Sequence, residues 1–302
     1  MIDAFRPAFD ARGIELYAPR VVQTLSEEEL IRAVPKYDGW IIGDDPATRR
    51  VFEAGKTGRL KAAVKWGIGI DNVDFAAARE LAIPIINTPL MFGKEVADVA
   101  MAYVIALARE LFEIDKGVRA GGWPKPRGIS LEGKMLGLVG FGDIGRNLAR
   151  RALAADMRVI IYDPAVEADS VPPLVQQAAW PNRLDEADFL VFTCSLNERN
   201  RHMLNAEMLA RCTAGVRVVN VARGPLIDER ALIDALRTGH VHSAALDVFE
   251  SEPLPLDSPL RGFKRCIFGS HNGSNTKDAV LRASERAMEL LFGFLGLDGR
   301  PG

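Results

Sequence analysis

The sequence predicts an α/β fold in which parallel strands form a doubly wound sheet. Short apolar runs rich in Val, Ile and Leu alternate with segments whose apolar residues recur at helical spacing. Continuous apolar runs of this kind are typical of strands buried on both faces, as parallel sheets require. One glycine-rich turn, GFGDIG at residues 140–145, joins such a run to a helix. The 302 residues are enough for two domains with sizeable cores.

The N-terminal part predicts a small α/β domain of its own. Ser26 is a favourable N-cap for a helix over about 27–34. Further along, apolar runs predict strands, and one segment between two such runs predicts a second helix. The predicted strands cover residues 14–18, 39–42, 61–66 and 83–87, and the second helix covers 71–81.

The loop from Lys65 to Asp74, KWGIGIDNVD, follows a predicted strand and contains two glycines. Backbone amides exposed between the glycines are able to bind a small anion. A plain glycine turn that joins a strand to a helix is an equally good interpretation of these residues alone.

Residues 93–116 predict one long helix whose apolar side chains cover a wide face. A helix this apolar is expected to be buried between domains or against another subunit. The next stretch, 117–130, contains four glycines and two prolines and predicts a loop. Trp123 in this loop is either covered by a partner subunit, covered by another domain or exposed.

Residues 131–164 predict a strand, a tight turn, a helix and a second strand. The first strand, 135–139, ends at Gly140, which permits the sharp turn. Gly142 lets the backbone approach a pyrophosphate, and Gly145 lets the helix pack closely on the strand. The free amides and the positive dipole end of the helix then face the phosphates.

Asp163 stands at the end of the second strand of this unit, 157–162, eighteen residues after Gly145. A carboxylate at this place accepts hydrogen bonds from both hydroxyls of an adenosine ribose and repels a 2′-phosphate. The spacing therefore predicts binding of NAD rather than NADP.

The same alternation continues to the C-terminus without an internal repeat. The predicted strands cover 189–192, 216–221, 243–248 and 266–268, and the predicted helices cover 205–212, 228–238 and 278–295.

Composition restricts the partners. With 38 basic and 40 acidic residues the net charge is −2, which gives no electrostatic case for nucleic acid or for an anionic membrane. No uncharged apolar stretch approaches eighteen residues, and charges near the N-terminus argue against a signal peptide. The three cysteines have no metal-ligand spacing, so we expect no metal site and a reducing, cytoplasmic compartment.

Reactive side chains follow three of the predicted strands. Arg223 closes one strand and is able to hold a carboxylate through two parallel hydrogen bonds. Glu250 and Glu252 follow the next strand, and His271 follows the third. A glutamate beside a histidine raises the imidazole pKa and fixes its tautomer, which suits a general acid/base. Because open α/β sheets bind ligands at these strand ends, the three sites together predict catalysis beside a dinucleotide.

On these residues the chain resembles the NAD-dependent D-isomer-specific 2-hydroxyacid dehydrogenases. The shared motifs run nearly from end to end in the family's order: GIGIDNVD, INTP, VGFGDIG, YDP, RHMLN, NVARGPLID, ALDVFESEP and SHNGSNT. The DNVD and INTP context is most similar to the phosphoglycerate dehydrogenase-like branch.

The resemblance implies two Rossmann-like domains, each with a doubly wound parallel sheet, and a cofactor cleft between them. Residues 1–92 and 277–302 would form the substrate domain, and residues 93–276 the NAD-binding domain. The family also implies a homodimer built around the helix at 93–116 and the loop after it.

The resemblance also implies the roles of individual residues. Arg223 would bind the substrate carboxylate and carbonyl, His271 would be the acid/base, and Glu252 would be paired with it. The substrate carboxylate would lie on the backbone amides of Trp66, Gly67, Ile68 and Gly69. The implied cofactor-binding residues are Gly140, Gly142, Asp143, Ile144, Gly145, Asp163, Ser195, Ala222 and Asp247, the last of them near the nicotinamide carboxamide.

Some positions depart from the family pattern and bear on substrate preference more than on reaction type. They are Asp98 in place of a common glutamate, Thr193-Cys194-Ser195, Ser270 before the histidine and Asn272 after it.

The implied reaction interconverts a D-2-hydroxy acid and its 2-oxo acid by hydride transfer. Neutral His271 takes the hydroxyl proton in oxidation, and protonated His271 donates it in reduction, while Arg223 polarises the carbonyl. Phosphoglycerate dehydrogenase-like activity and glyoxylate or hydroxypyruvate reduction both remain open. A corepressor-like NAD(H) sensor on the same scaffold is the alternative of another class. Formate dehydrogenase-like chemistry is disfavoured because Glu252 is available to His271.

Overall fold

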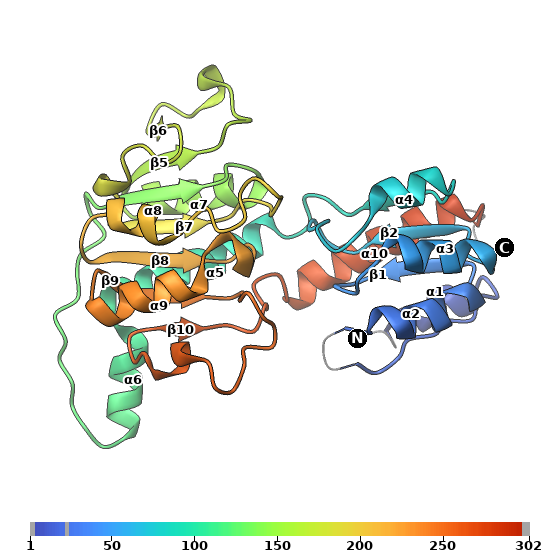
Figure 1. Cartoon of the computed structure of the whole chain (residues 1–302), viewed down its shortest axis with the longest axis horizontal. Helices are drawn as coiled ribbons and strands as arrows, with labels where there is room; N and C mark the ends of the chain where they lie inside the picture. The colour runs from blue at the N-terminus through green and yellow to red at the C-terminus, as the bar shows by residue number, and fades with distance from the viewer. Residues whose placement is uncertain (1–3, 22–23, 298–302) are drawn as a thin grey trace. The chain divides into compact units, whose positions relative to one another are not determined.

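The computed structural model describes residues 4–21 and 24–297 and divides into two compact units. The first unit is formed by Met1–Met91 and Lys277–Gly302, and the second by Phe92–Thr276. The chain leaves the first unit once and returns to it through its last helix (Figure 1). Residues 1–3, which belong to the N-terminal stretch that we weighed as a signal peptide, lie outside the described range.

The second unit is built on a seven-stranded parallel sheet in the order β10-β9-β8-β7-β4-β5-β6. The chain winds outward from β4 to β6, crosses to β7 on the other side of β4, and continues outward to β10. The winding direction reverses between β4 and β7, the place where doubly wound sheets bind ligands. The strands are β4 Met135–Val139, β5 Arg158–Tyr162, β6 Val175–Gln177, β7 Phe189–Phe192, β8 Val216–Asn220, β9 Val241–Leu246 and β10 Ile267–Phe268.

Helices cover both faces of this sheet, which explains why its central strands are apolar throughout. Every residue of β4, β7 and β8 is buried. Two helices, α5 and α7, lie on one face, and α8 and α9 lie on the other (Figure 1). Their bounds are Gly93–Arg109 for α5, Asp143–Ala154 for α7, Ala206–Arg211 for α8 and Glu229–Thr238 for α9. Asp98 on α5 forms an ion pair with Arg151 on α7, at 2.5 Å, so this departure from the family pattern has a structural partner.

The prediction of one helix over 93–116 is wrong. The first helix, α5, ends at Arg109, and a second helix, α6 Leu111–Arg119, follows. Glu110 between them has φ 52° and ψ 38°, a left-handed conformation that breaks the helical hydrogen-bond ladder. The loop expected from residue 117 begins only after Arg119, and Gly128 within it packs against the backbone of Ala108.

The first unit has a smaller parallel sheet, β1-β2-β3, among its described residues. Successive side chains of its central strand point to opposite faces of the sheet. Ala62 and Val64 pack with Leu291 and Ala287 of α10, whereas Ala63 belongs to the core on the other face. The strands are β1 Gly39–Ile42, β2 Ala62–Lys65 and β3 Ile85–Asn87, and the helices are α1 Arg6–Asp10, α2 Glu27–Ala33, α3 Arg49–Thr57, α4 Phe75–Glu80 and α10 Lys277–Phe294. The N-cap predicted at Ser26 is confirmed, because Ser26 and Glu29 form a reciprocal capping box.

The strand expected at residues 14–18, all of which the structure describes, does not form. Ile14 and Leu16 pack instead in a small cluster with Phe9, Met288 and Phe292, and the Ile14 amide donates to the Phe9 carbonyl at 3.0 Å. Ile14 and Leu16 therefore pack against α10 without joining the sheet. No helix within the described residues has the length and apolar character needed to cross a membrane.

Candidate active site

The glycine turn after β4 is shaped by two close backbone contacts. Gly140 has φ 94°, and a Cβ added there would lie 2.7 Å from the Cα of Cys194. A Cβ on Gly145 would lie 2.2 Å from the Gly140 carbonyl oxygen, so α7 packs directly on the turn. Gly142, at the N-cap of α7, has no described atom within 4 Å of an added Cβ. The turn thus leaves open space where the helix N-terminus points its amides, which fits the pyrophosphate of NAD.

Asp163 is the residue expected to bind the adenosine ribose, and its side chain also forms a hydrogen bond with the glycine turn. One carboxylate oxygen accepts the amide of Phe141 at 2.7 Å, and the other accepts the amide of Ala165 at 2.9 Å. A carboxylate has about four acceptor sites, so capacity remains for ribose hydroxyls. The side chain therefore joins the end of β5 to the turn and keeps a negative charge at the nucleotide edge.

The other residues expected around the cofactor differ in their surroundings. Asp143 lies against Gly93, where an added Cβ would be 2.1 Å from its carboxyl carbon. Ser195 is exposed, and its carbonyl accepts a hydrogen bond from the Asn200 side chain at 2.7 Å. Ala222, the second residue after β8, is buried, and its amide donates to the side-chain oxygen of Asn220.

Asn220, the last residue of β8, builds the turn that carries Arg223. Its side chain is 1% exposed, and its amide group donates to the Arg223 carbonyl at 2.8 Å. The side-chain oxygen accepts the Ala222 amide at 3.0 Å. The guanidinium of Arg223 itself donates to the Ala222 carbonyl at 2.8 Å. Asn220 opens the NVARGPLID motif, but the sequence analysis assigned it no role in the site. A polar residue at the end of an apolar strand is a signal for such a turn.

The Arg223 turn and the loop after β9 touch backbone to backbone at Gly224. A Cβ on Gly224 would lie 1.9 Å from the carbonyl carbon of Phe249. Beside this contact, the Glu229 amide donates to the Glu250 carboxylate at 3.0 Å. The Glu250 carboxylate also lies 2.9 Å from Nε2 of His202. Glu250 is therefore engaged with His202 and α9.

Glu252 is the carboxylate that faces His271. Its Oε2 lies 2.8 Å from Nδ1 of His271, and its Oε1 accepts the Phe249 amide at 2.9 Å. Both side chains are about one quarter exposed. The structure thus brings together two residues nineteen positions apart, each beyond the end of its own strand, and separates Glu252 from the alternative Glu250.

Asp247 fixes the backbone of the segment that holds His271. Its side chain is 3% exposed and accepts the amides of Asn272 at 3.1 Å and Gly273 at 2.8 Å. The Asp247 carbonyl accepts the His271 amide at 2.7 Å. Burial, followed by the charge of Asp247, raises the pKa of Tyr103 on α5 to about 12. Asp247 is therefore a buried anion on which the histidine loop is built.

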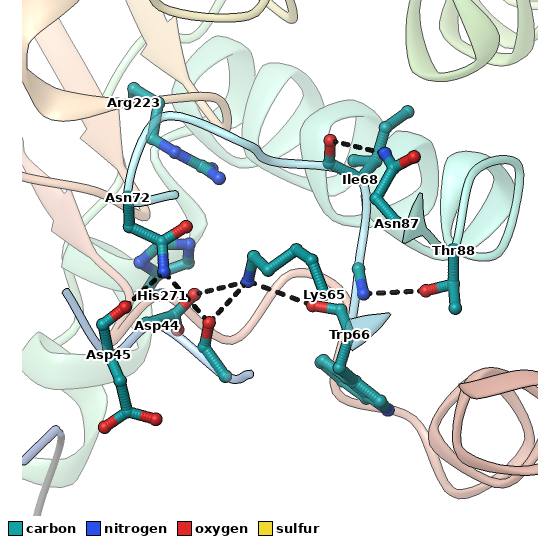
Figure 2. Close-up of polar contacts among 12 residues, drawn as sticks. Asp44, Asp45, Lys65, Trp66, Ile68, Asn72, Asn87, Thr88, Arg223 and His271 are labelled. Carbon is teal, nitrogen blue, oxygen red and sulfur yellow. Dashed lines mark hydrogen bonds and ion pairs between the residues drawn. The ribbon is translucent and has the colours of Figure 1, made fainter. Parts of the chain in front are cut away.

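The loop after β2 offers fewer amides than the sequence suggested. The Trp66 amide donates to the Ile42 carbonyl at 2.9 Å. The Gly67 amide donates to Oγ1 of Thr88 at 2.7 Å (Figure 2). The amides of Ile68 and Gly69 have no hydrogen-bond partner within residues 4–21 and 24–297. Of the four amides expected to hold a carboxylate, the two at Ile68 and Gly69 are available to a ligand.

Two features bear on metal and redox chemistry. The part of the chain that the structure describes contains no group of three or more metal-ligating side chains of the His, Cys, Asp and Glu types. Cys194, Cys212 and Cys266 are free thiols, and burial raises their pKa values to about 12, 11 and 11.

Comparisons with known proteins identify the family to which the chain belongs. The family model described as "D-isomer specific 2-hydroxyacid dehydrogenase, NAD binding domain" matches residues 101–273, all within the second unit. The chain is 37% identical over 279 residues to hydroxypyruvate reductase of Thermotoga maritima, covering 90% of each protein. A solved structure of a protein from Thermus thermophilus matches with a TM-score of 0.89 and 33% identity, over 97% of this chain and 94% of that one.

Another relative is longer than this chain. D-3-phosphoglycerate dehydrogenase 2, chloroplastic, of Arabidopsis thaliana is 39% identical over 259 residues, which cover 84% of this chain and 41% of that protein. The reductase and the dehydrogenase are both named as enzymes, and neither is named as a corepressor. The chain belongs to the D-isomer-specific 2-hydroxyacid dehydrogenases, NAD-dependent oxidoreductases that interconvert a D-2-hydroxy acid and its 2-oxo acid.

Proposed function

We propose that the chain reduces a small 2-oxo acid, with hydroxypyruvate and glyoxylate as the first candidates and 3-phosphohydroxypyruvate as the second. The observation that carries the catalytic part is the 2.8 Å contact between His271 and Glu252. The hydroxypyruvate reductase of Thermotoga maritima supports the order of candidates, because the match covers 90% of both chains. The phosphoglycerate dehydrogenase relative is matched over less than half of its length.

His271 is proposed to move the proton at the substrate oxygen. The carboxylate beside Nδ1 favours the protonated imidazole, which reduction requires as a donor. The same contact orients the ring, so Nε2 is the nitrogen assigned to the substrate. Bound NADH supplies the hydride that C2 of the 2-oxo acid receives.

Arg223 and the loop after β2 are proposed to bind the substrate. A guanidinium holds a carboxylate through two parallel bonds and also polarises a carbonyl as negative charge develops on its oxygen. The Ile68 and Gly69 amides would add two neutral donors to the carboxylate. In this proposal residues 1–92 and 277–302 act as the substrate domain, and residues 93–276 act as the NAD-binding domain.

The proposed assembly is a homodimer formed through α5, α6 and the following loop. Apolar side chains on α6 and in the loop are exposed in the single chain, with Trp123 at 78%. The others are Leu111, Phe112 and Val118. A mass measured by light scattering that equals one chain would contradict this.

We also propose a cytoplasmic location, because three free thiols suit a reducing compartment.

The test of the reaction is NADH oxidation against hydroxypyruvate, glyoxylate, 3-phosphohydroxypyruvate and pyruvate. We expect the highest kcat/KM with one of the first two. His271→Ala should lower kcat/KM by about 10²–10⁴-fold, the usual effect of removing a positioned acid/base. His240→Gln, a histidine elsewhere in the second unit, is the matched control. Wild-type activity in His271→Ala would overturn the catalytic assignment.

A further inference from the structure

A buried lysine ends β2, directly before the loop that is proposed to bind the substrate carboxylate. Lys65 is 2% exposed. Lysine is almost never buried to this degree unless its ammonium is paired. Its Nζ donates to the Gly43 carbonyl at 2.7 Å and to the Trp66 carbonyl at 3.0 Å. The carboxylate of Asp44, whose side chain is half exposed, lies 3.4 Å away.

These contacts tie together the ends of the strands in the first unit. Gly43 follows β1 and Trp66 follows β2, so the ammonium holds one carbonyl from each strand end (Figure 2). Thr88, which follows β3, accepts the Gly67 amide. The carbonyl and the amide of the Trp66–Gly67 peptide are therefore held by a buried cation and a buried hydroxyl.

The far end of the same loop is held at the same place. The side-chain amide of Asn72 donates to the Gly43 carbonyl at 3.0 Å and to the Asp45 carbonyl at 2.7 Å. The Gly43 carbonyl thus accepts from both Lys65 and Asn72, one at the start of the loop and one near its end. Between these two fixed points lie Ile68 and Gly69, whose amides have no partner within the described ranges.

We propose that Lys65 is a positioning residue for substrate binding, which rests on the proposed function. Its ammonium orients the Trp66 carbonyl, and this sets the direction in which the next amides of the loop point. Preorganised donors bind an anion without the cost of reorganisation, and a positive charge beneath them favours a carboxylate over a neutral ligand. Lys65 does not touch the substrate in this proposal; it acts through the loop.

A role for Lys65 in stability alone would give a different result from a role in positioning. If Lys65 only stabilised the first unit, its loss would lower the melting temperature and leave the substrate KM unchanged. If it positions the amides, its loss weakens carboxylate binding in protein that is still folded. The decisive variant is Lys65→Met, which keeps most of the length of the side chain and removes the charge and both carbonyl contacts.

The experiment measures KM and kcat for the best 2-oxo acid, and the Kd of oxamate for the enzyme–NADH complex by fluorescence. We expect KM and the oxamate Kd of Lys65→Met to rise about 10- to 100-fold, the size typical of losing well-placed hydrogen bonds to a charged group. The Kd of NADH should be unchanged and kcat should change much less than KM. Lys65→Arg keeps the charge and should recover part of the affinity. Asp44→Asn is the matched control, because it removes the half-exposed carboxylate beside Lys65 and keeps the lysine. The KM of this variant should be the same as in the wild type or smaller.

Each outcome decides the proposal. A folded Lys65→Met with wild-type KM and oxamate Kd would overturn it, and the proposed reaction would stand. Wild-type protein that binds oxamate but turns over no 2-oxo acid would overturn the proposed function alone. If Lys65→Met does not fold, Thr88→Val removes the acceptor of the Gly67 amide. Unchanged oxamate affinity in that variant would overturn the assignment of the carboxylate to this loop.

Discussion

The Glu252 carboxylate lies against His271 and the backbone of its own loop at once. One oxygen is 2.8 Å from Nδ1 of His271, and the other accepts the Phe249 amide at 2.9 Å. A carboxylate held by its own loop cannot rotate freely away from the ring, so the pair is fixed from the Glu252 side. The histidine backbone is fixed separately, through Asp247.

Replacing Glu252 with Gln should move the pH profile of 2-oxo acid reduction to lower pH. The amide keeps the shape and removes the negative charge, so the imidazole loses its proton at lower pH and the donor form becomes scarce earlier. The measurement is kcat/KM against pH, with NADH binding followed separately. Glu250→Gln, whose carboxylate lies beside His202, is the control that should not shift. If the pH profile shifted in Glu250→Gln and not in Glu252→Gln, Glu250 would be the carboxylate that acts on His271.

Asp163→Ser should narrow the preference for NADH over NADPH and also weaken NADH binding. The substitution removes the charge that repels a 2′-phosphate, and it removes the acceptor of the Phe141 amide in the glycine turn. We expect the ratio of kcat/KM values for the two cofactors to fall by about tenfold or more, since hydrogen bonds to a charged group are worth about 1.5–3 kcal/mol. Asp185→Ser, at an exposed site in the same unit, should change nothing. Stronger turnover with NADPH than with NADH in the wild type would refute the role of Asp163.

His242 should make the folded protein less stable as pH falls from about 6.5 to 4. Burial, then Arg217 and Arg265, lowers the pKa of His242 from 6.5 to about 4, and the Glu110 carboxylate 3.7 Å away does not reverse this. Between these values the unfolded chain binds a proton that the folded chain does not, so protonation favours unfolding. The loss is of the order of 1–3 kcal/mol, because the side chain retains some contact with solvent.

Urea unfolding at a series of pH values between 4 and 7.5 measures this contribution. His242→Asn removes the titrating group and should flatten the curve in that window relative to wild type. An identical slope in wild type and variant would show that other groups carry the acid sensitivity.

The strands of both units were predictable where burial is continuous. All of β7 and β8 is buried, and the apolar runs there marked the strands to within one residue. The edge strand β6 of the larger unit was not predictable, because two of its three residues are exposed glutamines and no apolar run marks it. The break at Glu110 was not predictable either, because the left-handed residue is a glutamate and not the glycine that usually signals such a turn.

Some features of the candidate site were also predictable from the sequence, and others were not. Arg223, Glu252 and His271 follow apolar strands, so their shared location at strand ends could be inferred from order along the chain. The sequence could not show that the Trp66 and Gly67 amides already have hydrogen-bond acceptors. Those acceptors, the Ile42 carbonyl and the Thr88 hydroxyl, come from two other strand ends. The burial of Lys65 depends on tertiary contacts of the same kind, because the carbonyls that accept from its ammonium follow two different strands.

Gly224→Ala should damage catalysis far more than its single added methyl suggests. The new Cβ would lie 1.9 Å from the carbonyl carbon of Phe249 and 2.4 Å from the Glu250 nitrogen, and both are backbone atoms that cannot rotate away. The Arg223 turn and the loop that carries Glu252 must therefore move apart. A displacement of about 1 Å in positioned groups can cost on the order of 10² in rate, and overpacking typically costs about 1–3 kcal/mol of stability.

The matched control is Gly262→Ala, in the same unit, where an added Cβ has no described atom within 4 Å. Both variants are compared for kcat/KM, NADH affinity and free energy of unfolding. We expect Gly262→Ala to behave as wild type, and Gly224→Ala to retain NADH binding while losing most of its turnover, because the glycine turn at residues 140–145 lies on a different strand end. Full activity in Gly224→Ala would mean that the two loops need not be in contact for the reaction, and the assignment of Arg223 and Glu252 to one reacting centre would then fall.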